Sequence, residues 1–247
     1  AAALKAGLDI ELPNPTMYPQ GLKDALSDGL ITEDNINRSV TRILKQKFRL
    51  GLFENPYVDT DAIRLNLPEE KELAAKIAEK SITLLLNKSI LPISKDIKKI
   101  ALIGPNAHEV MALFGNYSFE NHVVSTHYKD MAEEVVHAPT VFDKLKEKLG
   151  ASRITYAKGC NILDKELSMI PEAVKAAKNA DIAILVVGDK AGHFRTGSVG
   201  EGTDTPDLSL PGGQEELVKA IFDTGKPVVI VLLNGRPFAM PEIAKKA

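Results

Sequence analysis

The segment "DIAILVVGD" at residues 181–189 decides the fold, because it sets six apolar side chains, Ile182 to Val187, directly one after another. A short, uninterrupted run of this kind is typical of a strand buried on both faces of a parallel sheet. Similar apolar runs occur at "KKIALIG" (98–104), "RITYAKG" (153–159) and "KPVVIVLLNG" (226–235), and helical patterns near 139–149, 171–179 and 212–224 separate them. The alternation predicts an α/β domain whose parallel sheet is covered by helices on both faces.

The N-terminal region, up to about residue 60, shows a different pattern. It contains a predicted short strand, Leu8 to Leu12, and two predicted helices over residues 20–29 and 32–48. In the second helix Thr32 is the expected N-cap, and apolar side chains recur at helical spacing along one face. The stretch "GLFENPYVD" (51–59) then ends the periodicity, which indicates a linker. A further helix is predicted over residues 68–87.

These patterns predict two regions of unequal completeness. One strand and two helices cannot bury their own apolar faces, so residues 1–60 are predicted to be the C-terminal end of a larger α/β domain plus a linker. Residues 61–247 are predicted to form the second α/β domain. The chain opens in what resembles the last turn of a helix and closes soon after a predicted helix start at Pro241. We therefore expect a part of a longer protein, with its second domain truncated at the C-terminus.

Composition excludes several classes of partner and cofactor. Lys and Arg total 31 against 33 Asp and Glu, a balance that favours neither nucleic acid nor an anionic membrane surface. The single cysteine, Cys160, cannot form an internal disulfide, and the five histidines lack the close spacing of a metal site. No apolar run reaches the roughly 18 residues of a membrane span. We expect no metal and no cofactor, and the sequence leaves open whether the chain forms a homo-oligomer.

One long loop carries the main candidate for a functional residue. The loop follows the predicted strand at 181–189 and contains "TGSVGEGTDTPDLSLPGG" (196–213), in which Glu201 stands between Gly200 and Gly202. Open α/β sheets bind ligands at the carboxyl ends of their strands, and long loops in compact domains are often functional. The flanking glycines allow unusual backbone angles and a close approach to a ligand. From position alone, however, a solvated glutamate is the plainer interpretation.

A series of short motifs strengthens the functional interpretation. In chain order they are "AGLDIELP" (6–13), "SVTRILKQKFRLGLFENPYVD" (39–59), "AEKSITLLLN" (78–87), "IALIGPNA" (100–107), "YAKGC" (156–160), "ILVVGD" (184–189), "GEGTD" (200–204), "DLSLPGGQEELV" (207–218) and "VVIVLLNGRP" (228–237). Together they resemble family 3 glycoside hydrolases, the group of β-glucosidases and β-xylosidases. The resemblance follows the family order and covers nearly the whole chain.

The resemblance implies an enzyme of two parts that acts on β-linked glycosides or oligosaccharides without a cofactor. A (β/α)8 barrel holds the nucleophilic aspartate, and a six-stranded α/β sandwich supplies a loop with the acid/base glutamate, whose place Glu201 takes. A retaining glycosidase needs both carboxyl groups: one protonates the leaving oxygen, and the other attacks the anomeric carbon. The glutamate then acts as the base that activates water.

Two features depart from the family pattern. The family's nucleophile stands in a segment before the helix that opens this chain, so we assign the nucleophile to no residue here. Asp9 matches a family position near the end of the eighth barrel strand, where a structural role or a contact in the wall of the site is expected. Many family members have an arginine after the aspartate of the acid/base loop, whereas Thr205 follows Asp204 in this chain.

Other charged side chains near the loop are weaker candidates for substrate or loop contacts. His193 and Arg195 could touch a sugar or the carboxylates, although a solvated or locally hydrogen-bonded role is the plainer interpretation. Asp189 could orient the loop or cap a turn, and Asp204 could contact substrate. Arg236 is expected in a structural ion pair.

Two functions therefore remain open from the sequence. The first is a fragment of a retaining β-glycosidase with Glu201 as acid/base. The second is a non-catalytic α/β domain that binds a small molecule or a protein partner. "GSVGEG" (197–202) lacks the lysine of a phosphate-binding P-loop and the spacing of a dinucleotide fingerprint, which argues against nucleotide binding. An upstream barrel with the nucleophilic aspartate would distinguish the two.

Overall fold

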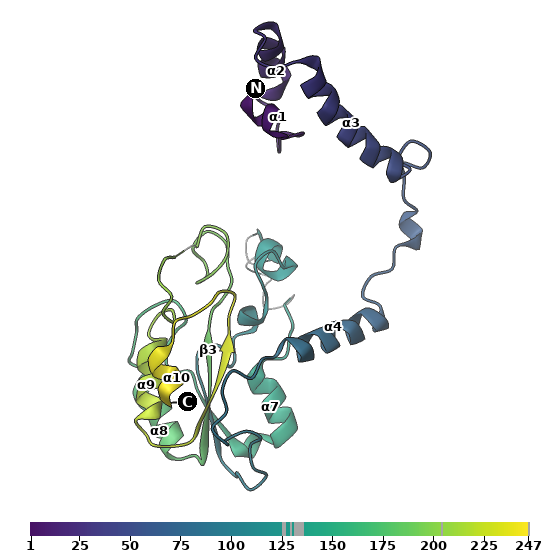
Figure 1. Cartoon of the computed structure of the whole chain (residues 1–247). Helices are drawn as coiled ribbons and strands as arrows, with labels where there is room; N and C mark the ends of the chain where they lie inside the picture. The colour runs from purple at the N-terminus through teal and green to yellow at the C-terminus, as the bar shows by residue number, and fades with distance from the viewer. Residues whose placement is uncertain (125–126, 129, 131–135, 204, 247) are drawn as a thin grey trace. The chain divides into compact units, whose positions relative to one another are not determined.

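The computed structural model describes residues 1–124, 127–128, 130, 136–203 and 205–246. Its contacts divide the chain into two compact units, Ala1–Ile82 and Thr83–Ala247. The second unit contains the sheet and the Glu201 loop (Figure 1).

The first unit is helical. It consists of α1 (Ala2–Ala6), α2 (Tyr18–Ser27), α3 (Glu33–Arg49), a 3-10 turn η1 (Thr60–Ala62) and α4 (Pro68–Ser81). Thr32 is the N-cap of α3, as predicted, and its backbone amide donates to Asn35 Oδ1 at 3.1 Å. A small cluster of buried apolar side chains, Leu4, Ala25 and Ile31, joins the first helices. Most of the apolar face of α3 stays exposed, including Phe48, which is 61% exposed.

The prediction of a strand at Leu8 to Leu12 is wrong. The structure has no strand in this segment, and its polar groups bond locally: Tyr18 Oη donates to the carbonyl of Leu8, and the carboxylate of Glu11 accepts the backbone amides of Met17 and Tyr18. A strand needs a neighbouring strand to satisfy its backbone groups. No neighbouring strand lies beside this segment within the described part of the first unit.

The helix predicted over residues 68–87 also ends early, at Ser81. Its C-cap, Ile82, already has extended angles of φ −71° and ψ 120°. The next residue is also β-branched, and two β-branched residues in succession favour extended backbone over helix. The helical pattern of α4 therefore stops where the sequence changes from "AEKS" to "ITLLL".

The second unit is built on a four-stranded parallel sheet with the strand order β2-β1-β3-β4 among the described residues. The strands are β1 (Ile100–Ile103), β2 (Ile154–Ala157), β3 (Ile182–Gly188) and β4 (Val228–Leu233), so all four predicted strands form. The register pairs Leu102 of β1 with Tyr156 on one side and with Ile184 on the other. The parallel α/β fold predicted from the apolar runs is confirmed, and four strands are present where the resemblance implies six.

Helices cover both faces of this sheet. They are α7 (Val141–Leu149), α8 (Ile170–Lys178), α9 (Gln214–Phe222) and α10 (Pro241–Lys246). Figure 1 shows α8, α9 and α10 on one face and α7 on the other. Alternate side chains of β3 enter the two cores: Leu185 packs toward α8 and α9, whereas Ile184 packs toward α7. All seven residues of β3 are buried, which explains why its apolar run has no polar alternation.

Shorter helical segments complete the connections. They are η2 (Val110–Leu113), the π-helical turn η3 (Glu120–Val124) and η5 (Ala151–Arg153). The first two follow β1, in the connection between β1 and α7. They matter for the site because β1 is the neighbour of β3 in the sheet.

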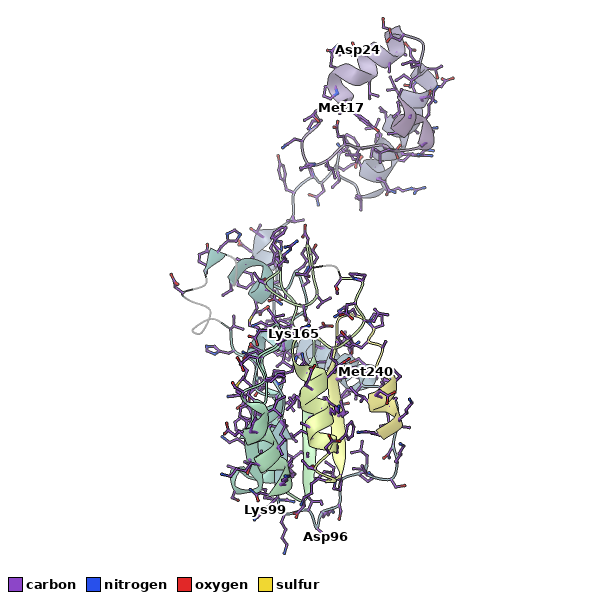
Figure 2. The ribbon with its side chains drawn as sticks, turned by 90° about the vertical axis from the view of Figure 1, so that its left-hand side faces the viewer. Met17, Asp24, Asp96, Lys99, Lys165 and Met240 are labelled. Atoms are coloured by element: carbon purple, nitrogen blue, oxygen red, sulfur yellow. The ribbon has the colours of Figure 1, made fainter. Side chains whose placement is uncertain are left out.

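The two edges of the sheet are distinct in Figure 2. Lys99, which precedes β1, lies with Asp96 at the amino ends of the strands, and Lys165, which follows β2, lies toward the carboxyl ends. At the amino edge the Asp181 carboxylate accepts the backbone amides of Lys98 and Lys99, each at 2.9 Å. The loop with Glu201 leaves the opposite edge, after β3.

Close packing at the carboxyl edge requires glycine. Gly188 ends β3 with a φ of +134°, and a Cβ at this position would lie 1.8 Å from the carbonyl oxygen of Leu233. Gln214, at the start of α9 and fully buried, bonds the same glycine: its Oε1 accepts the Gly188 amide at 2.7 Å and its Nε2 donates to the Gly188 carbonyl at 2.9 Å. The end of β3 is therefore fixed before the loop begins.

Candidate active site

The loop after β3 begins at Asp189, which is only 3% exposed and binds several parts of the loop and its surroundings. Its Oδ1 accepts the Ser198 hydroxyl at 2.8 Å, and its Oδ2 accepts the backbone amide of Gly235 at 3.1 Å. Asn106 Nδ2 donates to the backbone carbonyl of Asp189 at 2.7 Å. Asp189 thus orients the loop, one of the two roles considered for it from the sequence, and is too deeply buried to contact a ligand directly.

Arg236 connects the start of the loop with its end. Its Nε lies 3.5 Å from Asp189 Oδ1, and its Nη1 donates to the carbonyl of Asp207 at 2.6 Å. The guanidinium also lies 4.7 Å from the centre of the Phe238 ring. The structural ion pair expected for Arg236 is present, and the two ends of the loop are held together by one side chain.

Both glycines beside the candidate glutamate have backbone angles that favour glycine. Gly200 has a φ of +125° and Gly202 a φ of +72°. A Cβ at position 200 would lie 2.2 Å from the carbonyl oxygen of Gly192, and one at position 202 would lie 3.2 Å from the Phe194 ring. The glycines have the unusual backbone angles that the sequence predicted, and they let the loop pack closely against itself.

Glu201 has an exposed carboxylate with one hydrogen-bond donor in the described structure. Tyr117 Oη donates to Glu201 Oε2 at 2.7 Å. This hydrogen bond raises the pKa of the Tyr117 hydroxyl above its usual value, because the bond favours the protonated phenol beside a carboxylate. Two backbone amides position the residue further: the Phe194 amide donates to the Glu201 carbonyl at 2.7 Å, and the Gly192 amide donates to the Val199 carbonyl at 3.0 Å.

His193 is buried, so the solvated role is wrong, one of the two plainer roles, solvated or locally hydrogen-bonded, that the sequence left for it. It is 5% exposed, and its ring centre lies 5.2 Å from Tyr117 and 4.7 Å from His122. Its Nε2 has no hydrogen-bond partner among the described residues. The chain turns directly after this residue, where the Thr196 amide donates to the His193 carbonyl at 3.0 Å. The imidazole packs against the rings of Tyr117, His122 and Phe194, and its burial removes it from direct contact with solvent.

The other candidates are Arg195, Asp9 and Asp204. Arg195 lines a cavity of about 620 Å³ together with Lys165 (labelled in Figure 2) and Arg236. Asp9 belongs to the first unit and forms an ion pair with Arg42 at 3.2 Å, which gives it a structural role there. Asp204 lies outside the described residues. The structure therefore brings Glu201 together with Asp189, His193 and Arg195 in the one loop after β3, whereas Asp9 belongs to the first unit.

Tyr117 was missed by the sequence analysis. It precedes Glu201 by 84 residues, and a lone tyrosine in a turn carries no motif of its own. One signal could have found it: the segment after β1 leaves the carboxyl edge of the sheet beside β3, so its polar and aromatic side chains should lie near the Glu201 loop.

The described ranges show no cluster of His, Cys, Asp and Glu that could hold a metal ion. Within the same ranges, no helix has both the length and the apolar character of a membrane span.

Comparison with known proteins gives consistent results. The profile of the "Glycosyl hydrolase family 3 C-terminal domain" matches residues 82–247. A β-xylosidase of Formosa agariphila is 40% identical over 98% of this chain and 33% of its own length. A periplasmic β-glucosidase of Salmonella typhimurium is 31% identical over 96% of the chain and 32% of its own length. The chain thus spans about a third of the length of these curated relatives.

Solved structures show the same likeness. A β-glucosidase involved in saponin metabolism from intestinal bacteria has a TM-score of 0.77 and 30% identity, covering 97% of this chain and 34% of that chain. The β-glucosidase of Listeria innocua in complex with isofagomine has a TM-score of 0.73 and 30% identity, covering 99% of this chain and 32% of that chain.

A parallel α/β sheet with a glycine-flanked glutamate loop at its carboxyl edge defines an α/β domain whose candidate site lies at the carboxyl ends of the strands. The matched profile and the relatives then identify the family. This chain belongs to glycoside hydrolase family 3, and residues 82–247 correspond to the C-terminal domain of that family.

Proposed function

We propose that this chain is part of a retaining β-glycosidase that releases terminal β-D-glucosyl or β-D-xylosyl residues from glycosides or oligosaccharides, with Glu201 as general acid and base. The observation that carries the proposal is the placement of the Glu201 carboxylate. It is exposed at the carboxyl edge of the sheet, between two glycines of positive φ, in a family 3 C-terminal domain. The names of the relatives, β-xylosidase and β-glucosidase, supply the class of substrate.

The chemistry requires a proton donor that later becomes a proton acceptor. In the first step Glu201 gives its proton to the glycosidic oxygen while a second carboxylate attacks the anomeric carbon, so that the leaving group departs as an alcohol. In the second step Glu201 takes a proton from water, which attacks the glycosyl-enzyme and releases the sugar with retained configuration. Two carboxyl groups suffice, and the proposal needs no metal or cofactor.

The proposed nucleophile comes from a barrel segment of the longer natural protein. In this arrangement residues 1–60 form the end of a (β/α)8 barrel and its linker, and residues 61–247 belong to the α/β sandwich that carries the acid/base loop. The exposed apolar face of α3 supports this division, because a helix with such a face needs a neighbouring surface. The length of the relatives, about three times that of this chain, leaves room for the barrel.

The test uses the full-length protein that contains this sequence. We expect hydrolysis of 4-nitrophenyl β-D-glucoside or β-D-xyloside, and NMR of the first-formed sugar should show the β-anomer. Glu201→Gln should lower kcat by a factor of about 100 or more on glycosides with poor leaving groups. Glu215→Gln is the matched control, because Glu215 is another exposed glutamate of the same unit, and this variant should retain activity.

An α-anomer as the first product would contradict the retaining mechanism. Wild-type turnover of Glu201→Gln on alkyl glycosides would remove Glu201 from the acid role. Absence of any glycosidase activity, with binding of a ligand retained, would favour the alternative of a non-catalytic binding domain.

A further inference from the structure

The hydrogen bond between Tyr117 and Glu201 joins two loops that leave neighbouring strands. Tyr117 lies between η2 and η3, in the segment after β1, and Glu201 lies in the loop after β3. The phenol oxygen is 2.7 Å from Glu201 Oε2, the one carboxylate oxygen of Glu201 that has a hydrogen-bond partner among the described residues. The other oxygen, Oε1, is left available to a ligand.

The turn that presents Tyr117 is fixed by a buried amide. Asn121, which is 3% exposed, donates through Nδ2 to the carbonyls of Phe114 and Gly115 at 2.9 and 3.0 Å. Tyr117 itself has a φ of +65°, a conformation that side chains other than glycine rarely adopt. Such a backbone persists only where the surrounding structure enforces it, and it is common at functional sites.

Unfavourable backbone angles recur on the opposite loop. Of the five non-glycine residues with positive φ in the described ranges, Tyr117, Phe194 and Arg195 lie at this junction, with φ of +65°, +48° and +70°. Phe194 is the residue whose amide donates to the Glu201 carbonyl. The loop after β1 and the loop after β3 therefore both have unfavourable backbone angles close to the Glu201 carboxylate.

Further contacts hold the two loops together independently of the hydrogen bond. A Cβ on Gly200 would lie 2.9 Å from Asn116 Oδ1, so the turn before Tyr117 lies directly against the glycine before Glu201. The Tyr117 ring packs against the buried His193 ring at 5.2 Å between centres. The Tyr117 side chain, which is 60% exposed, therefore rests on the buried His193 ring with its hydroxyl at the Glu201 carboxylate.

We propose that Tyr117 is a positioning residue for Glu201: it holds Oε2 and so directs the catalytic proton to Oε1. The inference rests on the proposed function of Glu201 as acid/base. A protonated carboxyl group carries its proton on one oxygen and accepts hydrogen bonds on the other. Because the Tyr117 hydroxyl donates to Oε2, Oε2 is the acceptor in both protonation states, and Oε1 both gives the proton to the leaving oxygen and takes one from water.

The role has a measurable consequence for different leaving groups. Proton donation matters most when the leaving alcohol is a poor leaving group, and little when it is a 2,4-dinitrophenolate. A residue that orients the acid should therefore affect the two substrates unequally. A residue that only supports the fold should affect both equally, because it changes the amount of correctly folded enzyme.

The experiment compares Tyr117→Phe with wild type in the full-length protein, using alkyl and 2,4-dinitrophenyl β-glycosides. We expect kcat/KM on the alkyl glycoside to fall by about 10-fold to 100-fold, while kcat/KM on the dinitrophenyl glycoside stays within about 3-fold. Phenylalanine keeps the ring that packs against His193. The matched control is Tyr156→Phe, which removes a phenol in β2 that packs against Phe142, and it should leave both values unchanged.

A second measurement does not depend on activity. NMR of isotope-labelled tyrosine Cζ in the full-length protein, with Tyr117→Phe to assign the signal, reports the pKa of the Tyr117 hydroxyl. The Glu201 carboxylate raises this pKa, so Glu201→Gln should lower it. The Tyr156 signal should not respond to Glu201→Gln.

The outcomes separate this inference from the proposed function. An equal loss on both substrates in Tyr117→Phe, or no loss on either, would overturn the positioning role. An unchanged Tyr117 pKa in Glu201→Gln would do the same. If Glu201→Gln shows wild-type rates on the alkyl glycoside, the proposed function itself fails, whatever Tyr117→Phe shows.

Discussion

Asp189 and Arg236 form a largely buried ion pair, with 3.5 Å between Oδ1 and Nε, at the base of the loop that carries Glu201. The side chains are 3% and 16% exposed. Because Arg236 also binds the carbonyl of Asp207, the pair joins the first residue of the loop to its far end. The conformation of the candidate acid/base loop therefore depends on two residues that bind the loop near its two ends.

Removing one member of this pair should destabilise the second unit. Arg236→Ala leaves the Asp189 carboxylate buried beside uncharged donors, and we expect the free energy of unfolding to fall by about 3 kcal/mol. Urea denaturation measures the change. Lys190→Ala is the control, because its ion pair with Glu109 is more exposed and should contribute less than about 1 kcal/mol. Equal losses in both variants would contradict the role of the buried pair.

Replacing Gln214 should destabilise the second unit more than replacing an exposed polar side chain does. It is fully buried and satisfies both the amide and the carbonyl of Gly188. In Gln214→Ala two buried backbone groups lose their partners, at about 1 to 3 kcal/mol for each unsatisfied group. Gln20→Ala removes an exposed amide that bonds Asp24 and should cost about 0.5 kcal/mol or less. Thermal melting of both variants checks the ranking, which a small effect of Gln214→Ala would refute.

Cys160 should be unreactive while the protein is folded. Its side chain is fully buried, and desolvation raises its pKa to about 12. The nucleophilic thiolate is therefore scarce at mildly alkaline pH. Because this is the single cysteine of the chain, labelling with a thiol reagent reports on Cys160 alone. We expect slow labelling of the native chain and fast labelling in denaturant. Equally fast labelling in both conditions would show that the α8–α9 face of the sheet opens readily.

Asp181 should make stability depend on pH in the acid range. Hydrogen bonds from the backbone amides of Lys99 and Lys98 lower the pKa of its carboxyl group below the usual value. The lowered pKa means that this stabilisation is fully present above the unfolded pKa of about 3.9 and is lost as pH falls through the folded pKa. Denaturation of wild type and Asp181→Asn at several pH values should show a stability difference that shrinks on acidification. A difference that grows instead would mean that the sign is wrong.

The sheet was predictable because the apolar pattern of strand β3 can be recognised in a short stretch of local sequence. Six consecutive apolar residues from Ile182 to Val187 fit only a segment buried on both faces, and β3 is such a segment. The segment at Leu8 to Leu12 alternates apolar side chains with Asp9 and Glu11 and forms no strand, since a strand also requires a neighbour that local sequence does not reveal. The early end of α4 at Ser81 likewise depended on competition between helical and extended preferences.

The candidate site was predictable in part. Glu201 could be found because its two flanking glycines and the strand before its loop can be recognised in one continuous stretch of sequence. Tyr117 could not be found in this way, because its contact with Glu201 arises from the adjacency of β1 and β3 in the sheet. The burial of His193 was also missed, since its ring packs against Tyr117 and His122, which are distant in the sequence.

The most direct test of the central claim is azide rescue of Glu201→Ala in the full-length protein, with a 2,4-dinitrophenyl β-glycoside as substrate. Such a leaving group hardly needs protonation, so the glycosyl-enzyme should form and accumulate while its hydrolysis, which needs the base, becomes slow. Azide is small enough to occupy the space of the missing carboxylate and needs no base. We predict restored turnover with a β-glycosyl azide as product, identified by NMR. No rescue by azide, together with wild-type turnover of alkyl glycosides, would show that Glu201 is not the acid/base.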